Sequence, residues 1–266
     1  MPYLDLPPDL KLYYEIDDYT DPWSRPDTVL FVHGANENTE AWRPWMPHLS
    51  RYYRLIRIDQ RGFGKTGAVS EGFEYTTGLF VDDFVRVINQ LSNAPVHVIG
   101  GKSGGINVIK LAATRPDLVK TITLCSTPIL PPKAKGWVDH MANQGMRSWV
   151  RSTMRSRLGS QMPERGIDWW VDLMGGTALT TMQAYLKWVS GIDVRPDLAH
   201  ITCPVLVLTT ESPYRDKAEV EAYRQHIKNL ELKIMATDGY HAAGADPDNS
   251  ARATLDFLNR HGQLTQ

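Results

Sequence analysis

The stretch that most constrains the fold is a short apolar run that ends in glycines around a serine. Residues 96–101 read Val-His-Val-Ile-Gly-Gly, Lys102-Ser103-Gly104-Gly105 follow, and residues 106–113 are mostly apolar. This order predicts a strand, a sharp turn and a buried helix, with Ser103 at the turn. Gly101, Ser103 and Gly105 fit the G-x-S-x-G spacing, in which small neighbours let the helix and the strand pass close to the serine.

A serine in this position suits nucleophilic chemistry, because the turn places its hydroxyl beside the free N–H groups and positive dipole end of a helix. The alternative is a glycine-rich turn that binds phosphate or is purely structural. A P-loop requires glycine six residues before its lysine, and Val96 stands there before Lys102, as Asp59 does before Lys65. The spacing therefore favours a nucleophilic serine, for which the rest of the chain must supply a base and an acid.

Composition bounds the protein class. The 266 residues are 42% hydrophobic and 22% charged with a formal net charge of -1, which suits one α/β domain with an insertion. We expect no nucleic-acid partner and no membrane partner, and the first residues do not read as a signal peptide, so a cytoplasmic location is expected. Cys125 and Cys203 lie beside predicted strands and are expected to be free core thiols.

Strand and helix patterns alternate along most of the chain. Residues 28–32 form a continuous apolar run, as in a strand buried on both faces of a parallel sheet. An amphipathic helix is predicted over residues 79–91, and Asp246 and Pro247 predict the start of a final helix. Further strands are predicted over residues 10–16, 53–58, 119–124, 204–209 and 232–235. The alternation predicts a mostly parallel sheet covered by helices on both faces.

The alternation breaks between residues 129 and 197. This segment has no strand pattern and is rich in tryptophan and methionine, so we expect a helical insertion folded over the sheet. Most of its large side chains are expected to pack the insertion, and a minority to line a ligand pocket. The expected substrate-binding residues are Trp137, Met141, Trp149 and Trp188.

Several motifs together resemble the α/β-hydrolase superfamily, along nearly the whole chain. They are His33-Gly34, residues 59–64 (Asp-Gln-Arg-Gly-Phe-Gly), the turn at Ser103, the strand after Pro204 and Gly239-Tyr240-His241. The resemblance implies an α/β-hydrolase core domain formed by residues 1–128 and 198–266, and a helical cap (lid) domain formed by residues 129–197. It also implies a triad with Ser103 as nucleophile and His241 as base, and an oxyanion hole formed by the N–H groups of Ala35 and Gly104.

The acid of the triad is less clear in the sequence. Relatives often carry an aspartate shortly after the strand that begins near Pro204, and that position is Pro213 here. Glu211 is the carboxylate nearest the strand end and is our predicted acid, with Asp216 as the alternative. Lys102 is unusual beside the nucleophile; we expect its side chain to point away from the pocket.

This constellation predicts a serine hydrolase that cleaves small carboxylic esters or lactones, acyl-homoserine lactones included, through an acyl-enzyme. No cofactor and no metal are expected, because no ligand motif or dinucleotide fingerprint is present. A homodimer remains open. The alternatives are a cofactor-free perhydrolase (haloperoxidase-like) or C–C bond hydrolase, and a ligand receptor on a hydrolase scaffold.

Overall fold

The computed structural model describes residues 2–92, 95–132, 134, 136–215 and 217–262. Its centre is an eight-stranded sheet in the order β1-β2-β4-β3-β5-β6-β7-β8. The first three strands in this order pair antiparallel, and all later pairs are parallel. The strands are β1 (Tyr3–Leu6), β2 (Leu10–Asp17), β3 (Thr28–Val32), β4 (Arg54–Ile58), β5 (Val96–Gly101), β6 (Val119–Cys125), β7 (Val205–Thr210) and β8 (Leu230–Met235).

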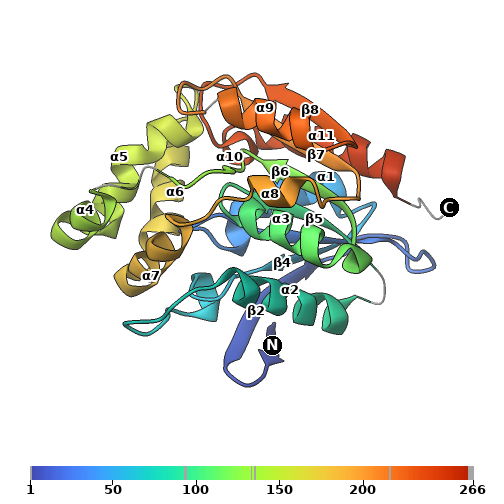
Figure 1. The fold of residues 1–266 in the computed structure, drawn as a ribbon, viewed down its shortest axis with the longest axis horizontal. Coiled ribbons are helices and arrows are strands. Elements are labelled where there is room, and N and C mark those ends of the chain that lie inside the picture. Colours follow the sequence, from blue (N-terminus) through green and yellow to red (C-terminus); the bar gives the residue numbers. More distant parts are fainter. Residues whose placement is uncertain (1, 93–94, 133, 135, 216, 263–266) are drawn as a thin grey trace.

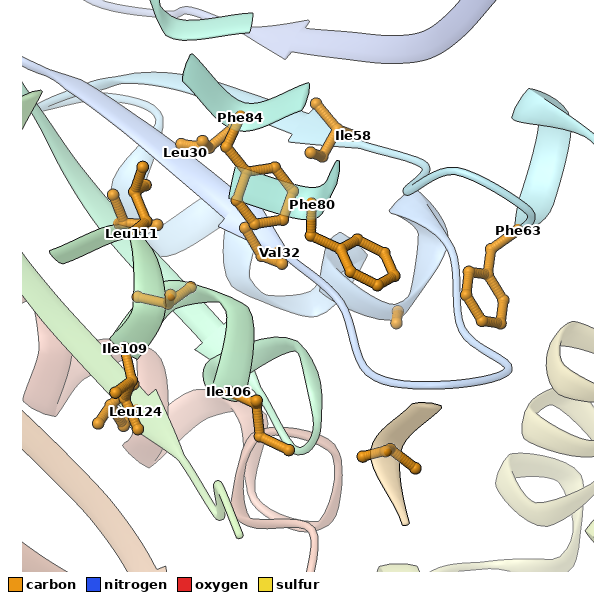
Figure 2. Packing of buried hydrophobic residues seen from close by; sticks show 14 of the residues in the cluster. Leu30, Val32, Ile58, Phe63, Phe80, Phe84, Ile106, Ile109, Leu111 and Leu124 are labelled. Carbon is orange, nitrogen blue, oxygen red and sulfur yellow. The ribbon is translucent and has the colours of Figure 1, made fainter. Parts of the chain in front are cut away.

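The central strands are apolar throughout because both faces of the sheet are covered. Along β3, Leu30 and Val32 belong to one buried cluster, whereas Val29 and Phe31 belong to the other. This is the period-two alternation of a strand buried on both sides. Figure 2 shows the first cluster, in which Phe80 and Phe84 of helix α2 (Thr77–Leu91) lie beside Leu30, Val32 and Ile58.

The helices that follow the strands form the two outer layers. Helices α2 (Thr77–Leu91), α3 (Gly104–Thr114) and α9 (Lys217–His226) cover one face. The other face is covered by the 3-10 helix η1 (Thr39–Trp45) and helices α1 (Met46–Leu49), α10 (Ala242–Ala245) and α11 (Pro247–His261). Two further short 3-10 helices are η2 (Gly64–Thr66) and η3 (Pro116–Leu118). The predicted fold class, a mostly parallel sheet flanked by helices, is confirmed.

Two local features differ from the sequence-based expectation. Strand β1 was not predicted, and it is an edge strand whose pairing with β2 gives it regular structure. Trp42, Trp45 and Leu49 stand at helical spacing and so predict one helix, whereas the structure forms a 3-10 segment followed by one short α-helix. Pro44 lies inside that segment, where it removes an N–H donor that a continuous α-helix would need. Asp246 does cap α11, as predicted, by accepting a hydrogen bond from the Asn249 N–H.

In the described part of the chain, five helices lie between β6 and β7: α4 (Trp137–Gln144), α5 (Met146–Leu158), α6 (Glu164–Gly175), α7 (Leu179–Val189) and α8 (Arg195–Leu198). Figure 1 places α4 to α7 together at one side of the sheet. Three arginines of α5 (Arg147, Arg151 and Arg155) each form an ion pair with an acidic residue of α6 (Asp172, Asp168 and Glu164, respectively). These arginines therefore join α5 to α6. The division into a core and a cap domain remains a prediction.

Candidate active site

The apex of the turn after β5 lies one residue earlier than the sequence predicts. Lys102 has a φ of 46°, in the left-handed region that side chains rarely adopt, whereas Ser103 is right-handed with φ -67° and ψ -17°. Ser103 is the N-cap residue of α3. Because a nucleophile elbow carries its strain at the apex, Lys102 and not Ser103 occupies the apex of this turn.

Close packing of the glycines explains this register. A Cβ on Gly100 would lie 2.6 Å from the Cα of Gly105, and one on Gly104 would lie 2.1 Å from the carbonyl oxygen of His33. A Cβ on Gly101 would lie 3.1 Å from the ring of Trp42, and the nearest backbone atom, the nitrogen of Gly34, would be 4.0 Å away. The two glycines forced by backbone contacts thus stand two residues before and two residues after Lys102. Gly100 and Gly104 flank Lys102 at the same spacing at which Gly101 and Gly105 flank Ser103. Spacing alone therefore could not decide whether Lys102 or Ser103 is the apex.

Lys102 points into the molecule and joins a buried charge cluster, contrary to the expectation that it points away. Its Nζ lies 2.6 Å from Oε1 of Glu37, and the same oxygen lies 3.1 Å from Nε2 of His241. All three side chains are buried. Lys102 Nζ, Glu37 Oε1 and both ring nitrogens of His241 nevertheless lack a hydrogen bond of good geometry. The cluster therefore has donor and acceptor directions left for a ligand.

Burial and mutual charge set the protonation states in this cluster. Burial lowers the pKa of Lys102 to about 8, although the Glu37 carboxylate acts in the opposite direction. Burial alone would raise the pKa of Glu37, but the charges of Lys102 and His241 hold it well below its ordinary value. Burial also lowers the pKa of His241. At neutral pH the cluster thus holds a carboxylate, a neutral imidazole and an amine close to its titration point.

Ser103 faces the predicted oxyanion donor. Its Oγ accepts a hydrogen bond from the Ala35 N–H, at 3.0 Å, and its side chain also interacts with Tyr185 of α7. Ser103 is half-buried. Within the described residues the structure records no hydrogen bond between Ser103 and His241. Gly104 is the first residue of α3; with Lys102 at the apex, the backbone N–H at the second oxyanion position belongs to Ser103.

The loop that carries His241 is attached to the helices between β6 and β7. The backbone N–H of His241 donates to the Arg157 carbonyl at the end of α5, and the Tyr240 N–H donates to Ser156. The ring of Trp170 from α6 packs against the His241 ring with centroids 5.3 Å apart. The position of the imidazole therefore depends on α5 and α6 as well as on the sheet.

The predicted acid, Glu211, does not lie at the histidine. Glu211 is exposed, and in the described part of the chain no hydrogen bond or ion pair joins it to His241. The chain leaving β7 buries Ser212 instead and turns Glu211 toward solvent. The alternative, Asp216, lies outside the described residues. The carboxylate that contacts His241 is Glu37, which follows β3 and which no sequence motif singled out.

The predicted substrate-binding residues mainly pack against other aromatic side chains. Trp137 and Trp149 pack against each other, and Trp188 packs against Phe80 and Tyr185. Met141 is buried in the large core cluster. An open hollow of about 500 Å³ lies between α4 and α7, lined by residues such as Val138 and Leu186, and it touches no residue of the charge cluster.

Two of the motifs, His33-Gly34 and residues 59–64, have structural roles. The Gln60 N–H donates to Nε2 of His33, and Nδ1 of His33 faces the Gly34 carbonyl, so both ring nitrogens have backbone partners. Asp59 accepts hydrogen bonds from the backbone N–H groups of Thr39 and Lys65. The His33 and Asp59 side chains thus hold loops at the carboxyl edge of the sheet.

No helix in the described ranges is long and apolar enough to cross a membrane, and these ranges contain no group of three potential metal ligands.

Comparisons with known proteins agree with this architecture. The (E)-2-((N-methylformamido)methylene)succinate hydrolase of Acinetobacter baylyi is 24% identical over 214 residues, which cover 75% of this chain and 78% of the relative. The enol-lactonase of Burkholderia xenovorans superimposes with a TM-score of 0.87 at 20% identity, over 97% of this chain and 100% of that one. A thermophilic esterase from Thermogutta terrifontis gives a TM-score of 0.83 at 21% identity, with 98% of each chain covered.

A family model provides the assignment. The model described as alpha/beta hydrolase fold matches residues 27–165, just over half of the chain. The match includes the His33 loop, the turn at Lys102 and Ser103, and the first helices after β6. This protein belongs to the alpha/beta hydrolase fold family.

Proposed function

We propose that this chain hydrolyses small carboxylic esters or lactones at the site formed by Ser103, Ala35 and His241. The observation that carries the proposal is the 3.0 Å hydrogen bond from the Ala35 N–H to Ser103 Oγ at a half-buried position. A backbone N–H in that position suits the oxyanion of a tetrahedral intermediate. The esterase and the enol-lactonase among the similar structures support the same class of substrate.

Ser103, and not the neighbouring Lys102, is the proposed nucleophile, because a hydroxyl group forms an ester intermediate that water can hydrolyse. An amine that attacks an ester releases the alcohol and leaves an amide, which does not turn over readily, whereas a serine ester can be hydrolysed. In the proposed reaction His241 accepts the Ser103 proton, passes it to the leaving alcohol, and then activates water to release the acid. Burial favours the neutral imidazole that this role requires.

The proposal requires a movement of the imidazole. His241 Nε2 contacts Glu37 in the structure, so the ring must turn toward Ser103 when substrate enters. Trp170 of α6 contacts the His241 ring and Tyr185 of α7 interacts with Ser103, so both helices border the site. We propose that the helices between β6 and β7 act as a cover over this site and that the acyl group lies against their aromatic side chains.

A fluorophosphonate probe tests the nucleophile directly. We expect one label on the peptide that contains Ser103, and loss of both label and ester hydrolysis in Ser103→Ala, by roughly 10⁴-fold or more in rate. Activity should be measured with p-nitrophenyl esters of rising chain length and with a series of lactones. Label on another residue, or unchanged turnover in Ser103→Ala, would exclude Ser103 as the nucleophile.

A further inference from the structure

We infer that Lys102 is a covalent site for carbonyl ligands, at which its amine forms a reversible imine with a ketone or aldehyde that carries a carboxylate. A 2-oxo acid is the simplest ligand of this class. The inference goes beyond the proposed ester hydrolysis and does not depend on it. It rests on the position of Lys102 in the turn, on the groups around its amine and on the charge of the site.

The first observation is the position. Lys102 occupies the apex of the turn, at φ 46°, in a backbone conformation that costs on the order of 1–3 kcal/mol for a residue with a side chain. The crowded glycines at 100 and 104 fix that apex. In this fold family the apex presents the attacking group to the substrate. Here the apex presents a primary amine.

The second observation is the surroundings of the amine. A lysine becomes a nucleophile when burial favours its neutral form. Lys102 is buried, its Nζ lies 2.6 Å from Glu37, and Glu37 contacts His241, which can carry protons. Burial lowers the pKa of Lys102 to about 8. About a tenth of the amine is then neutral at about pH 7, compared with less than about a thousandth at the ordinary lysine pKa.

The chemistry of amines selects the class of ligand. An ester would leave Lys102 blocked as an amide, whereas a ketone or aldehyde has no leaving group on its carbonyl carbon. Its imine is reversed by water, so the site can bind and release such a ligand repeatedly. Lys102 therefore suits carbonyl compounds that are not esters.

The charged groups around Lys102 favour a ligand that carries a carboxylate. Arg157 of α5 is buried, and its guanidinium lies over the rings of Trp149 and Tyr240. In the described residues the only hydrogen bond recorded for this guanidinium goes to Thr153. No acidic partner of Arg157 is present in the described ranges, and its charge reaches both Lys102 and His241. While Lys102 is protonated, Lys102 and Arg157 are two cations beside one carboxylate, Glu37, so the site before reaction favours a ligand that carries a carboxylate.

The imine forms without a change of oxidation state. The neutral Lys102 amine attacks the carbonyl carbon, the C–N bond forms, and the carbonyl π electrons move to oxygen. His241 first transfers one proton from nitrogen to this oxygen, which gives a carbinolamine with a hydroxyl group. It then transfers the second nitrogen proton to that hydroxyl group, which leaves as water while the C=N bond forms. One carbonyl compound and one amine thus give one imine and one water molecule.

Reductive trapping tests the inference on the whole chain. The protein is incubated with pyruvate and sodium cyanoborohydride, which reduces the C=N bond, and the adduct is located by peptide mass mapping. We expect one adduct, on Lys102. Lys102→Arg, which keeps a cation beside Glu37 but has no amine of this kind, should lose it, whereas the exposed control Lys233→Arg should keep it. Because mapping locates the adduct in the wild-type protein, the test does not depend on how well a variant folds.

Two readouts separate a site from surface chemistry. Trapping should rise with pH through about 8, and Glu37→Gln should move that midpoint lower, because the carboxylate holds the proton on Lys102. The charged groups that act on Lys102 from neighbouring elements are Glu37 after β3, His241 after β8 and Arg157 of α5. Pyruvate should also be trapped at roughly tenfold lower concentration than the neutral ketone butanone.

The outcomes are distinct from those of the ester proposal. Ser103→Ala should abolish ester hydrolysis and retain trapping on Lys102. Absence of an adduct in the wild-type protein, adducts spread over surface lysines, or a midpoint near the ordinary lysine pKa would each overturn the imine site. Equal trapping of pyruvate and butanone would overturn the preference for a carboxylate.

Discussion

Lys102 should make the stability of this protein depend on pH in a way that can be calculated. Its pKa falls from 10.5 to about 8 on folding, because burial outweighs the attraction of Glu37. Between these two values the unfolded chain binds more protons than the folded protein, so the free energy of unfolding rises with pH. At about 1.4 kcal/mol for each pH unit the full gain is ~3.4 kcal/mol, of which ~2 kcal/mol falls between about pH 7 and about pH 9.5.

The reference for this measurement is the double variant Glu37→Gln/Lys102→Met, which removes both members of the ion pair. Glu37 stays ionised across the whole window in the wild-type protein, so the difference between the two proteins reports Lys102. Urea unfolding followed by tryptophan fluorescence, with eight tryptophans in the chain, gives both free energies. The wild-type protein should gain ~2 kcal/mol relative to the variant over this range. A difference that stays constant with pH would show that folding does not perturb Lys102 and would refute the argument.

Three further predictions follow from named contacts. Gly100→Ala should destabilise the fold by ~1–3 kcal/mol or more, because its Cβ would lie 2.6 Å from the Cα of Gly105. Its control, Gly78→Ala on the exposed face of α2, should stabilise the fold by ~0.5–1 kcal/mol. Urea unfolding measures both free energies. Glu211→Gln should change ester turnover by no more than about twofold, since that carboxylate is exposed, and a loss of 10²-fold or more would restore it as the triad acid. Trp170→Leu should lower ester turnover by roughly tenfold or more while Ser103 is still labelled by a phosphonate, because the indole packs against the His241 ring; unchanged turnover would show that this contact does not position the imidazole.

Much of the fold could be predicted because its causes are local. The buried strands are continuous apolar runs, and the helices between them carry an apolar stripe, so the alternating architecture follows from the pattern. Strand β1 was missed because a short edge strand has no such pattern and depends on pairing with β2. The substrate cover was expected from a segment rich in tryptophan, yet contacts decide which side chain meets the site: Trp170 faces His241, whereas Trp137 and Trp149 face each other.

The glycine-flanked turn after a buried strand, and the place of His241 after the last strand, could be predicted because both are properties of spacing along the chain. Parallel strands bring their carboxyl ends together, so both segments were expected at one edge of the sheet. The apex at Lys102, and the contact of Glu37 and not Glu211 with His241, could be found only in the folded structure. Four glycines permit two registers of the turn, and the backbone contacts of Gly100 with Gly105 and of Gly104 with His33 select one of them. A carboxylate likewise gains its partner from three-dimensional proximity, which the 203 residues between Glu37 and His241 do not reveal.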